Sequence, residues 1–101
     1  MTKAEQLYTE IGQALKDAEQ SQMFGKPCFK ISGKAFIAFF KDSMVFKLNG
    51  LEHKEALSLD GSELFDPSGK GRAMKEWVQV PFHHKSEWKK LTKAALDYVK
   101  R

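Results

Sequence analysis

One run of residues constrains the fold of this chain more than any other feature: every side chain from Ala35 to Phe40 is apolar. A strand with one face in water alternates apolar and polar residues, and this run does not alternate. We therefore expect a central strand over residues 34–40 that is covered on both faces, by helices or by a partner subunit. The run is also far shorter than the roughly 20 residues that span a bilayer, so we expect no membrane partner.

The length of the chain, 101 residues, is the usual size of one domain, so we expect a single domain over residues 1–101. Its hydrophobic share of 42% and charged share of 30% are typical of a soluble globular protein and too apolar for a disordered one. Cys28 is the only cysteine, and the charges spread over residues 1–19 do not fit a signal peptide. Both observations favour a cytoplasmic location.

Apolar residues recur at helical spacing in three stretches, which predicts helices over residues 2–19, 51–59 and 84–100. Thr2 is suited to cap the first helix, and Glu5 three residues later would complete a capping box. The stripe that we expect the first helix to bury consists of Leu7, Ile11, Ala14, Leu15 and Ala18.

Short strands are expected before and after the second helix, with a tight hairpin turn at Ser32-Gly33. The predicted strands cover residues 28–31, 34–40, 44–48, 63–65 and 74–80. Strands joined by such short connections form a mostly antiparallel sheet, against which the helices pack. The sequence therefore predicts an α+β domain with the order α-β(3)-α-β(2)-α.

The positive charge of the chain is concentrated in its final third. The formal net charge is +4, but residues 67–101 alone carry nine bases and three acids. At 100° per residue, four lysines of the last predicted helix share one face: Lys85, Lys89, Lys93 and Lys100. This face is either a contact surface for phosphate backbones or an acidic protein, or a solvated face whose bases complement the helix dipole.

A glycine-rich loop over residues 66–72 carries two more cations. In Gly69-Lys70-Gly71-Arg72 the glycines would let the backbone approach an anion closely, with Lys70 and Arg72 beside them. The spacing is not that of a P-loop, and a strand rather than a helix is expected to follow. The loop is either a weak anion site or a mobile surface connection. Lys70 and Arg72 join the four helix lysines as candidate anion or nucleic-acid contacts.

No arrangement of side chains in the sequence points to catalysis. Cys28 lies between Pro27 and Phe29 at the start of a predicted strand, where a small buried hydrophobic residue is the default role. His83 and His84 are adjacent, so they cannot easily point into one metal site from a regular element. The chain contains no hydrolase triad, zinc-protease motif or dinucleotide fingerprint. We therefore expect no catalytic residue, no metal site and no cofactor.

Ten Phe and Trp side chains and four methionines are many for one small core. At strand spacing, most of these rings are expected to be core residues. An aromatic-lined groove or a dimer interface is the alternative explanation for the surplus.

Several motifs resemble those of a known family. Met23-Phe24-Gly25, Gly33-Lys34-Ala35-Phe36 and, after Asp42, Met44-Val45-Phe46-Lys47 are similar to the N-terminal domain of the TfoX/Sxy family. Trp77-Val78-Gln79-Val80-Pro81, Trp88 with Leu91, and Ala95-Leu96 with Tyr98-Val99 are similar to that family and to the related MmcQ/YjbR-like proteins. The resemblance covers about residues 7–100 and implies a short stand-alone member. It also implies the α-β(3)-α-β(2)-α layout, which type III secretion chaperones share.

The resemblance implies a regulatory rather than a catalytic role. TfoX/Sxy proteins regulate natural competence in bacteria together with a cyclic-AMP receptor protein, and MmcQ/YjbR-like members have been proposed to bind DNA. The family defines no catalytic residues. We therefore expect a non-enzymatic binding or regulatory module that acts through protein contacts, as a homodimer or with another protein. The alternatives are nucleic-acid binding through the six candidate cations, and an enzyme or small-ligand binder that uses an aromatic groove with the Gly-Lys-Gly-Arg loop.

Overall fold

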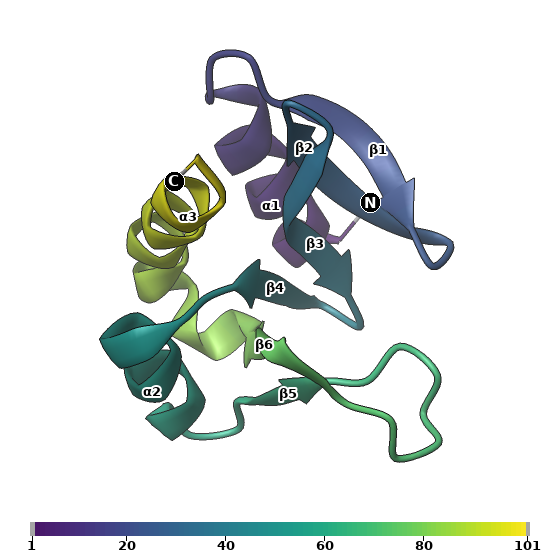
Figure 1. Ribbon diagram of the computed structural model, residues 1–101, viewed down its shortest axis with the longest axis vertical. Coiled ribbons are helices and arrows are strands. Elements are labelled where there is room, and N and C mark those ends of the chain that lie inside the picture. The colour runs from purple at the N-terminus through teal and green to yellow at the C-terminus, as the bar shows by residue number, and fades with distance from the viewer. Residues whose placement is uncertain (1, 101) are drawn as a thin grey trace.

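The computed structural model describes residues 2–100, which form a six-stranded antiparallel sheet and three α-helices (Figure 1). The predicted α+β class is thus confirmed. The strands lie in the order β1-β2-β3-β4-β6-β5, with bounds β1 (Glu19–Met23), β2 (Lys26–Ile31), β3 (Lys34–Phe40), β4 (Ser43–Lys47), β5 (Glu63–Phe65) and β6 (Met74–Pro81). The helices are α1 (Lys3–Gln13), α2 (Gly50–Ser58) and α3 (Lys85–Lys100), and a short 3₁₀ turn, η1 (Phe82–His84), precedes α3.

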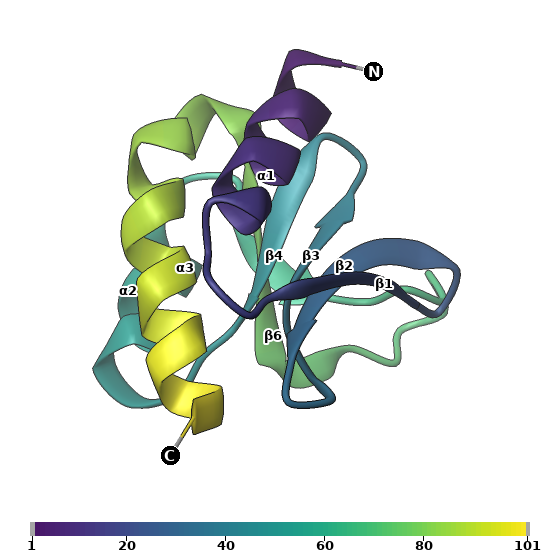
Figure 2. The same ribbon diagram turned by 90° about the horizontal axis from the view of Figure 1, so that it is seen from above.

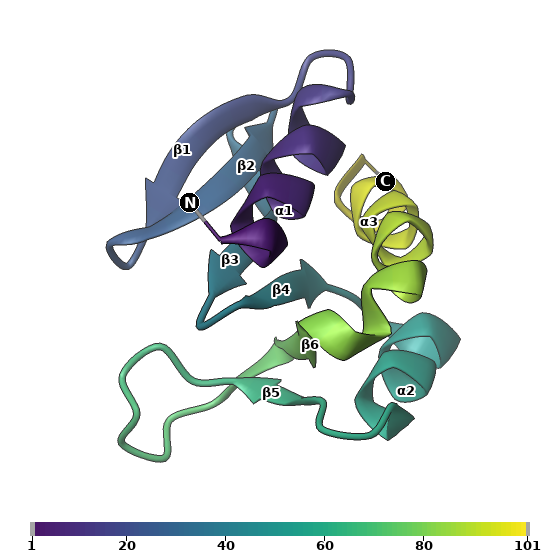
Figure 3. The same cartoon turned by 180° about the vertical axis from the view of Figure 1, so that it is seen from behind.

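All three helices lie on one side of the sheet (Figure 2). The middle helix is α3, with α1 and α2 on its two flanks (Figures 1 and 3). The main core lies between these helices and the sheet, and its largest fully buried side chain is Trp88. No helix within residues 2–100 is both long enough and apolar enough to cross a membrane.

The first helix is shorter than its periodicity predicts, and an unexpected strand follows it. The helix expected over residues 2–19 ends at Gln13, and Glu19–Met23 form β1. The chain turns over residues 14–17, where Asp17 has a φ of 68°, and β1 then pairs with β2 along its whole length. Because β1 is mostly exposed and polar, its sequence lacks the alternation of apolar residues that would predict a strand. The order is therefore α-β(4)-α-β(2)-α, and the other predicted elements lie within two residues of the observed bounds.

A β-bulge explains how β3 uses its unbroken apolar run. The register with β2 shifts between Phe29 and Lys30, which leaves Phe36 of β3 as an extra residue. Phe36 and Ile37 consequently both join the helix-side core. The residues of the run that pack on the opposite face are Ala35, Ala38 and Phe40. The prediction of a central strand covered on both faces is confirmed, and the cover comes from the chain itself.

The face without helices is covered because the sheet curls on itself. The rings of Phe40 on β3 and Phe65 on β5 have centroids 5.5 Å apart, although β4 and β6 lie between the two strands. In a flat sheet, three strand spacings would separate β3 from β5 by about 14 Å. The curl creates a second core of buried residues, made of Cys28, Ala38, Val45, Phe65 and Trp77.

The two cores account for the many aromatic residues. Nine of the ten Phe and Trp side chains belong to one core or pack against it. The tenth is Phe24, which is 61% exposed at the turn between β1 and β2. The prediction that most rings are core residues is therefore confirmed.

Two contacts with the sheet side set the position of α1. The Thr2 hydroxyl accepts a hydrogen bond from the backbone N–H of Glu5 (3.1 Å), as the predicted N-cap requires, and donates one to Asp42 in the β3–β4 turn (2.9 Å). At the other end of α1, Gly12 lies directly on Phe29. A Cβ at position 12 would lie 2.1 Å from a carbon of that ring, so only glycine permits this approach.

Candidate functional site

A groove of about 570 Å³ lies between α1 and α3, the two helices that face one another in Figure 3. Ile11 and Thr92 are its most buried lining residues. Leu7, Leu15 and Leu96 also line it and are only half-buried. The groove is therefore apolar and open, and its leucines have surface left over after the fold is complete.

The residues that α1 buries differ in part from those that the sequence predicts. The residues that α1 buries against the sheet are Ala4, Tyr8, Ile11 and Gly12. The Tyr8 ring packs on Phe29 and on Phe39, with centroid distances of 5.3 Å for each pair. The predicted buried stripe is therefore confirmed in part: Ile11 is buried, Leu7, Leu15 and Ala18 are partly buried against the core, and Ala14 is exposed. Ala18 lies beyond the end of the helix, and the other three partly buried or exposed members also line the groove. Those three are Leu7, Ala14 and Leu15.

Two of the predicted contact lysines lie at this groove. Lys89 and Lys93 on α3 are exposed and line it, and Glu10 on α1 is the carboxylate among its lining residues. Within residues 2–100, the one ion pair closer than 4 Å joins Lys90 to Glu55, on another side of α3. Lys89 and Lys93 therefore have no ion-pair partner in the described part of the chain. The result is an apolar groove with two lysines on its α3 rim that have no ion-pair partner within residues 2–100, and one carboxylate on its α1 rim.

The other two predicted lysines of α3 have different surroundings. The ammonium of Lys85 lies 5.1 Å from the centroid of the Phe82 ring, at the start of the helix. Lys100, at the opposite end, lines a hollow that also contains Asp17 and Glu19. All four lysines are exposed. Lys89 and Lys93 border the apolar groove, but Lys93 also lines a hollow with Glu52 and Asp97, so carboxylates lie near Lys93 as well as near Lys100.

The loop with Lys70 and Arg72 already holds an anion, which is the carboxylate of Asp66. That carboxylate accepts hydrogen bonds from the Ser68 hydroxyl (2.7 Å) and from the backbone N–H groups of Ser68 (3.1 Å), Gly69 (3.1 Å) and Gly71 (2.8 Å). The hydrogen bond from the Ser68 hydroxyl is the main reason why the pKa of Asp66 lies below its ordinary value, and the backbone amides lower it further. The amides that an external anion would use are therefore occupied, while the Lys70 and Arg72 side chains are exposed.

The six candidate cations do not form one surface. The loop over residues 66–72 and the helix α3 lie at opposite sides of the molecule in all three views (Figures 1, 2 and 3). Lys70 and Arg72 therefore form one set of exposed cations, and the four lysines of α3 form another.

A second hollow, of about 560 Å³, lies beside the loop on the face of the sheet that lacks helices. Phe40 is the aromatic residue that lines it, and the ammonium groups of Lys26 and Lys41 lie 5.1 and 5.2 Å from the ring centroid. Glu63 and Asp66 also line the hollow. Its lining is thus mixed in charge, and the groove between α1 and α3 has aliphatic walls, so the expected aromatic-lined groove is found in neither place.

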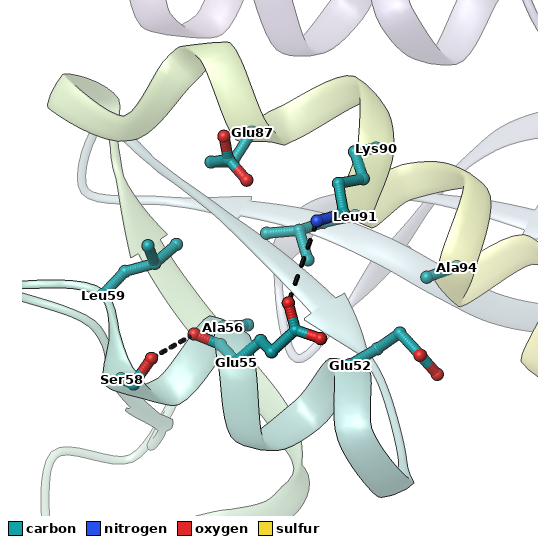
Figure 4. Close-up of a pocket in the computed structure, with 9 residues that line it drawn as sticks. All are labelled: Glu52, Glu55, Ala56, Ser58, Leu59, Glu87, Lys90, Leu91 and Ala94. Carbon is teal, nitrogen blue, oxygen red and sulfur yellow. Dashed lines mark hydrogen bonds and ion pairs between the residues drawn. The ribbon is translucent and has the colours of Figure 1, made fainter.

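On its other flank, α3 faces α2 across a pocket of about 180 Å³ (Figure 4). Three carboxylates line it, those of Glu52, Glu55 and Glu87, over a floor that includes Leu91. The ammonium of Lys90 lies 3.8 Å from the carboxylate of Glu55, which the dashed line in Figure 4 shows. This pocket is small, and the lysine on its rim is paired.

The residues with reactive or metal-binding side chains have local partners. The Nε2 atoms of His83 and His84 lie 3.1 and 2.6 Å from the Asp60 carbonyl, and that of His53 lies 2.7 Å from the Lys75 carbonyl. These distances place each imidazole in a hydrogen bond with the backbone. Within residues 2–100, no group of three His, Cys, Asp or Glu side chains is arranged to hold a metal ion. Cys28 is buried, and burial raises the pKa of its thiol.

Sequence reasoning found the lysines of the site but missed two carboxylates. The role of Asp66 could have been predicted, because an Asp two residues before a Ser in Asp66-Pro67-Ser68-Gly69 favours a turn closed by the carboxylate. The role of Glu10 could not have been predicted, because its place on the groove rim depends on the distance between α1 and α3.

Comparison of the sequence with protein-family models, with curated proteins and with solved structures gives no match. The candidate site therefore has to be interpreted from its own geometry.

Proposed function

We propose that the chain is a non-enzymatic binding module that acts through protein contacts, with the groove between α1 and α3 as its contact surface. The observation that carries the proposal is the groove itself, whose half-buried Leu7, Leu15 and Leu96 are left open to solvent. Apolar surface that a fold leaves exposed in one connected patch, rimmed by polar groups, is typical of interaction sites.

The local partners of the titratable side chains support a non-enzymatic role. A catalytic nucleophile or base needs an accessible site and a matched pKa. Cys28 is buried with a raised pKa, and His83 and His84 both bond to the Asp60 carbonyl. Asp66 is committed to the amides of its own loop.

The proposal includes membership in the TfoX/Sxy N-terminal-like family and a cytoplasmic location. The sequence motifs support the first, and the single cysteine supports the second. The additional strand β1 departs from the layout that the resemblance implies.

The partner in this proposal is a second copy of the chain or a different protein. Size-exclusion chromatography with light scattering separates the two cases. A dimer that persists on dilution and is lost when Leu96 is replaced by Glu identifies a second copy, and a monomer at high concentration excludes it.

Affinity capture with matched variants tests whether the groove is the contact surface. Leu96→Glu places a charge among the groove leucines, whereas Leu57→Glu places the same charge on α2, where the leucine is 37% exposed. We expect Leu57→Glu to retain the proteins bound by the wild type and Leu96→Glu to lose them. Ala14→Arg, at an exposed groove residue, should have the same effect without touching the core. An unchanged set of bound proteins for both groove variants, with thermal melts that show folding, would overturn the proposal.

One observation favours nucleic-acid binding as a second candidate: the lysines of α3 are exposed, and Lys89 and Lys93 have no ion-pair partner within residues 2–100. Fluorescence anisotropy with mixed DNA and RNA at about 50 mM salt tests it, because contacts with phosphates weaken steeply as salt increases. The comparison is with a variant in which Lys85, Lys89, Lys93 and Lys100 are all replaced by Glu. Equal signals for the two proteins, or no signal, would exclude this candidate.

A further inference from the structure

We propose that the groove between α1 and α3 takes an amphipathic helix of a partner protein, and that this helix carries acidic residues on the flank that faces α3. The inference rests on the proposed function and adds the chemistry of the partner to it. Three properties of the groove carry it: its walls, its length and its charge.

The walls of the groove favour a helix over a strand as the occupant. A strand binds by adding to the edge of a sheet, where unpaired backbone groups are available. Both walls of this groove are helices, α1 and α3, whose backbone groups within the groove are paired within each helix. The groove therefore offers side chains rather than a sheet edge, and an apolar stripe on a helix is the surface that complements its leucines.

The length of the groove sets the spacing of the apolar side chains with which a partner helix would bind. Its lining residues run from Leu7 on α1 to Leu15, two residues past the end of that helix, and from Lys89 to Leu96 on α3. At the rise of an α-helix the α3 segment is about 10 Å long, which corresponds to about two turns of a third helix. We therefore expect apolar anchors at positions i, i+3 or i+4, and i+7 of the partner.

The two rims of the groove differ in charge, and this difference favours one orientation of the partner helix. Lys89 and Lys93 on the α3 rim lack ion-pair partners within residues 2–100, and Glu10 lies on the α1 rim. Acidic residues on one flank of the partner stripe would meet the two lysines. Neutral or basic residues on the other flank would avoid repulsion from Glu10. Because these groups stay near solvent, their pairing contributes mainly to association rate and orientation, while the leucines contribute affinity.

The pocket on the other flank of α3 does not offer these properties. Its lining includes the carboxylates of Glu52, Glu55 and Glu87, and its lysine is already paired. An acidic helix would be repelled there, so the charge pattern selects the α1 flank.

Two synthetic peptides test the inference directly. Both are 14-residue helices with Leu at positions i, i+4, i+7 and i+11; one has Glu along one flank and the other has Lys at the same positions. Fluorescence anisotropy with the full chain, at about 150 mM salt, measures both affinities. We expect the Glu peptide to bind about tenfold more tightly, because two exposed charge pairs are gained rather than two repulsions.

Charge-reversal variants locate the effect. Lys89→Glu with Lys93→Glu should reverse the preference of the chain for the two peptides. Lys70→Glu with Arg72→Glu introduces the same change in net charge on the distant loop and should leave the preference unchanged. All four side chains are exposed, so both variants should fold, which circular dichroism checks.

The failure of this inference can be told apart from the failure of the proposed function. Equal binding of the two peptides that Leu96→Glu abolishes would overturn the acidic partner and leave the groove as a docking surface. Binding that Leu96→Glu does not reduce would overturn both. Absence of binding to either peptide overturns the helical occupant, and a chain that is already a dimer through the groove overturns it in favour of a second copy.

Discussion

The two flanks of α3 show the difference between a helix contact that completes the fold and one that leaves surface for another molecule. Toward α2 there are two hollows. One, of about 180 Å³, lies below the pair of Lys90 and Glu55, and the other, of about 370 Å³, is lined by side chains that include Glu52 and Asp97. Toward α1, the gap is about 570 Å³, and Lys89 and Lys93 have no ion-pair partner within residues 2–100. One helix therefore has a closed flank toward α2, where an ion pair joins the helices and carboxylates line the hollows, and an open flank toward α1, where half-buried leucines line the groove.

The difference arises from what fixes each neighbouring helix. The contact of Gly12 with Phe29 and the bond of Thr2 to Asp42 hold α1 against the sheet side of the molecule. The helix α2 is held by the sheet as well, through His53 and the Lys75 carbonyl of β6, and in addition by α3, through the pair of Glu55 and Lys90. Because its contacts with Phe29 and Asp42 hold α1 in place, α1 can stand apart from α3 and leave a groove between the two helices.

Two leucines of α3 should show the largest contrast between the flanks. Leu91 is 4% exposed and lines the α2 pocket, whereas Leu96 is half-buried in the α1 groove. We expect Leu91→Ala to lower the free energy of unfolding by about 3 kcal/mol, which includes the cost of a cavity. Leu96→Ala should cost about 1 kcal/mol, because much of its surface already meets water. Urea unfolding measures both, and equal costs would show that the two flanks are equally structural.

A substitution at Gly12 should disturb the open flank by moving α1. Alanine is favoured over glycine within a helix by about 1 kcal/mol. The new Cβ would lie 2.1 Å from the Phe29 ring, however, and such overpacking costs about 3 kcal/mol. We therefore expect Gly12→Ala to destabilise the protein by about 2 kcal/mol and to weaken binding at the groove.

The neighbouring exposed residue provides the control for this substitution. Gln13→Ala changes the same turn of α1 without meeting Phe29, so its effect on the unfolding free energy should stay below about 0.5 kcal/mol. If Gly12→Ala were as mild as Gln13→Ala, the contact with Phe29 would not set the position of α1.

The ion pair on the closed flank should have the smallest effect. The side chains of Lys90 and Glu55 are 66% and 52% exposed, so solvent screens their attraction. A double-mutant cycle with Lys90→Ala and Glu55→Ala should give a coupling of about 0.5 kcal/mol or less, and high salt should reduce it further. A coupling of several kcal/mol would mean that electrostatics, rather than the packing of Leu91, closes this flank.

Most of the fold could be predicted from the sequence because most of its elements carry a local pattern. The apolar run of β3 predicted a strand buried on both faces, and the helical spacing of apolar residues in α3 predicted the length of that helix. The strand β1 carried no such pattern, since its exposed polar residues are held by pairing with β2. The extent of α1 was overestimated because Ala14 and Leu15 keep helical spacing beyond Gln13, the last residue of the helix.

The candidate site could be predicted only in part. Helical geometry placed Lys89 and Lys93 on one face of α3, which the structure shows beside the groove. The groove itself depends on the distance between two helices that are far apart in the sequence. Nothing local in Leu7 or Leu96 distinguishes a leucine that will be buried from one that will line an open surface.

Site-specific photo-crosslinking tests the central claim most directly. A photoreactive phenylalanine derivative is placed at Ala14, which lines the open groove, or at Ala94, which lines the α2 pocket, and cells that express the chain are irradiated. The account predicts protein adducts from position 14 and none from position 94. Adducts from position 94 alone, equal adducts from both positions, or no adducts from position 14 would contradict it.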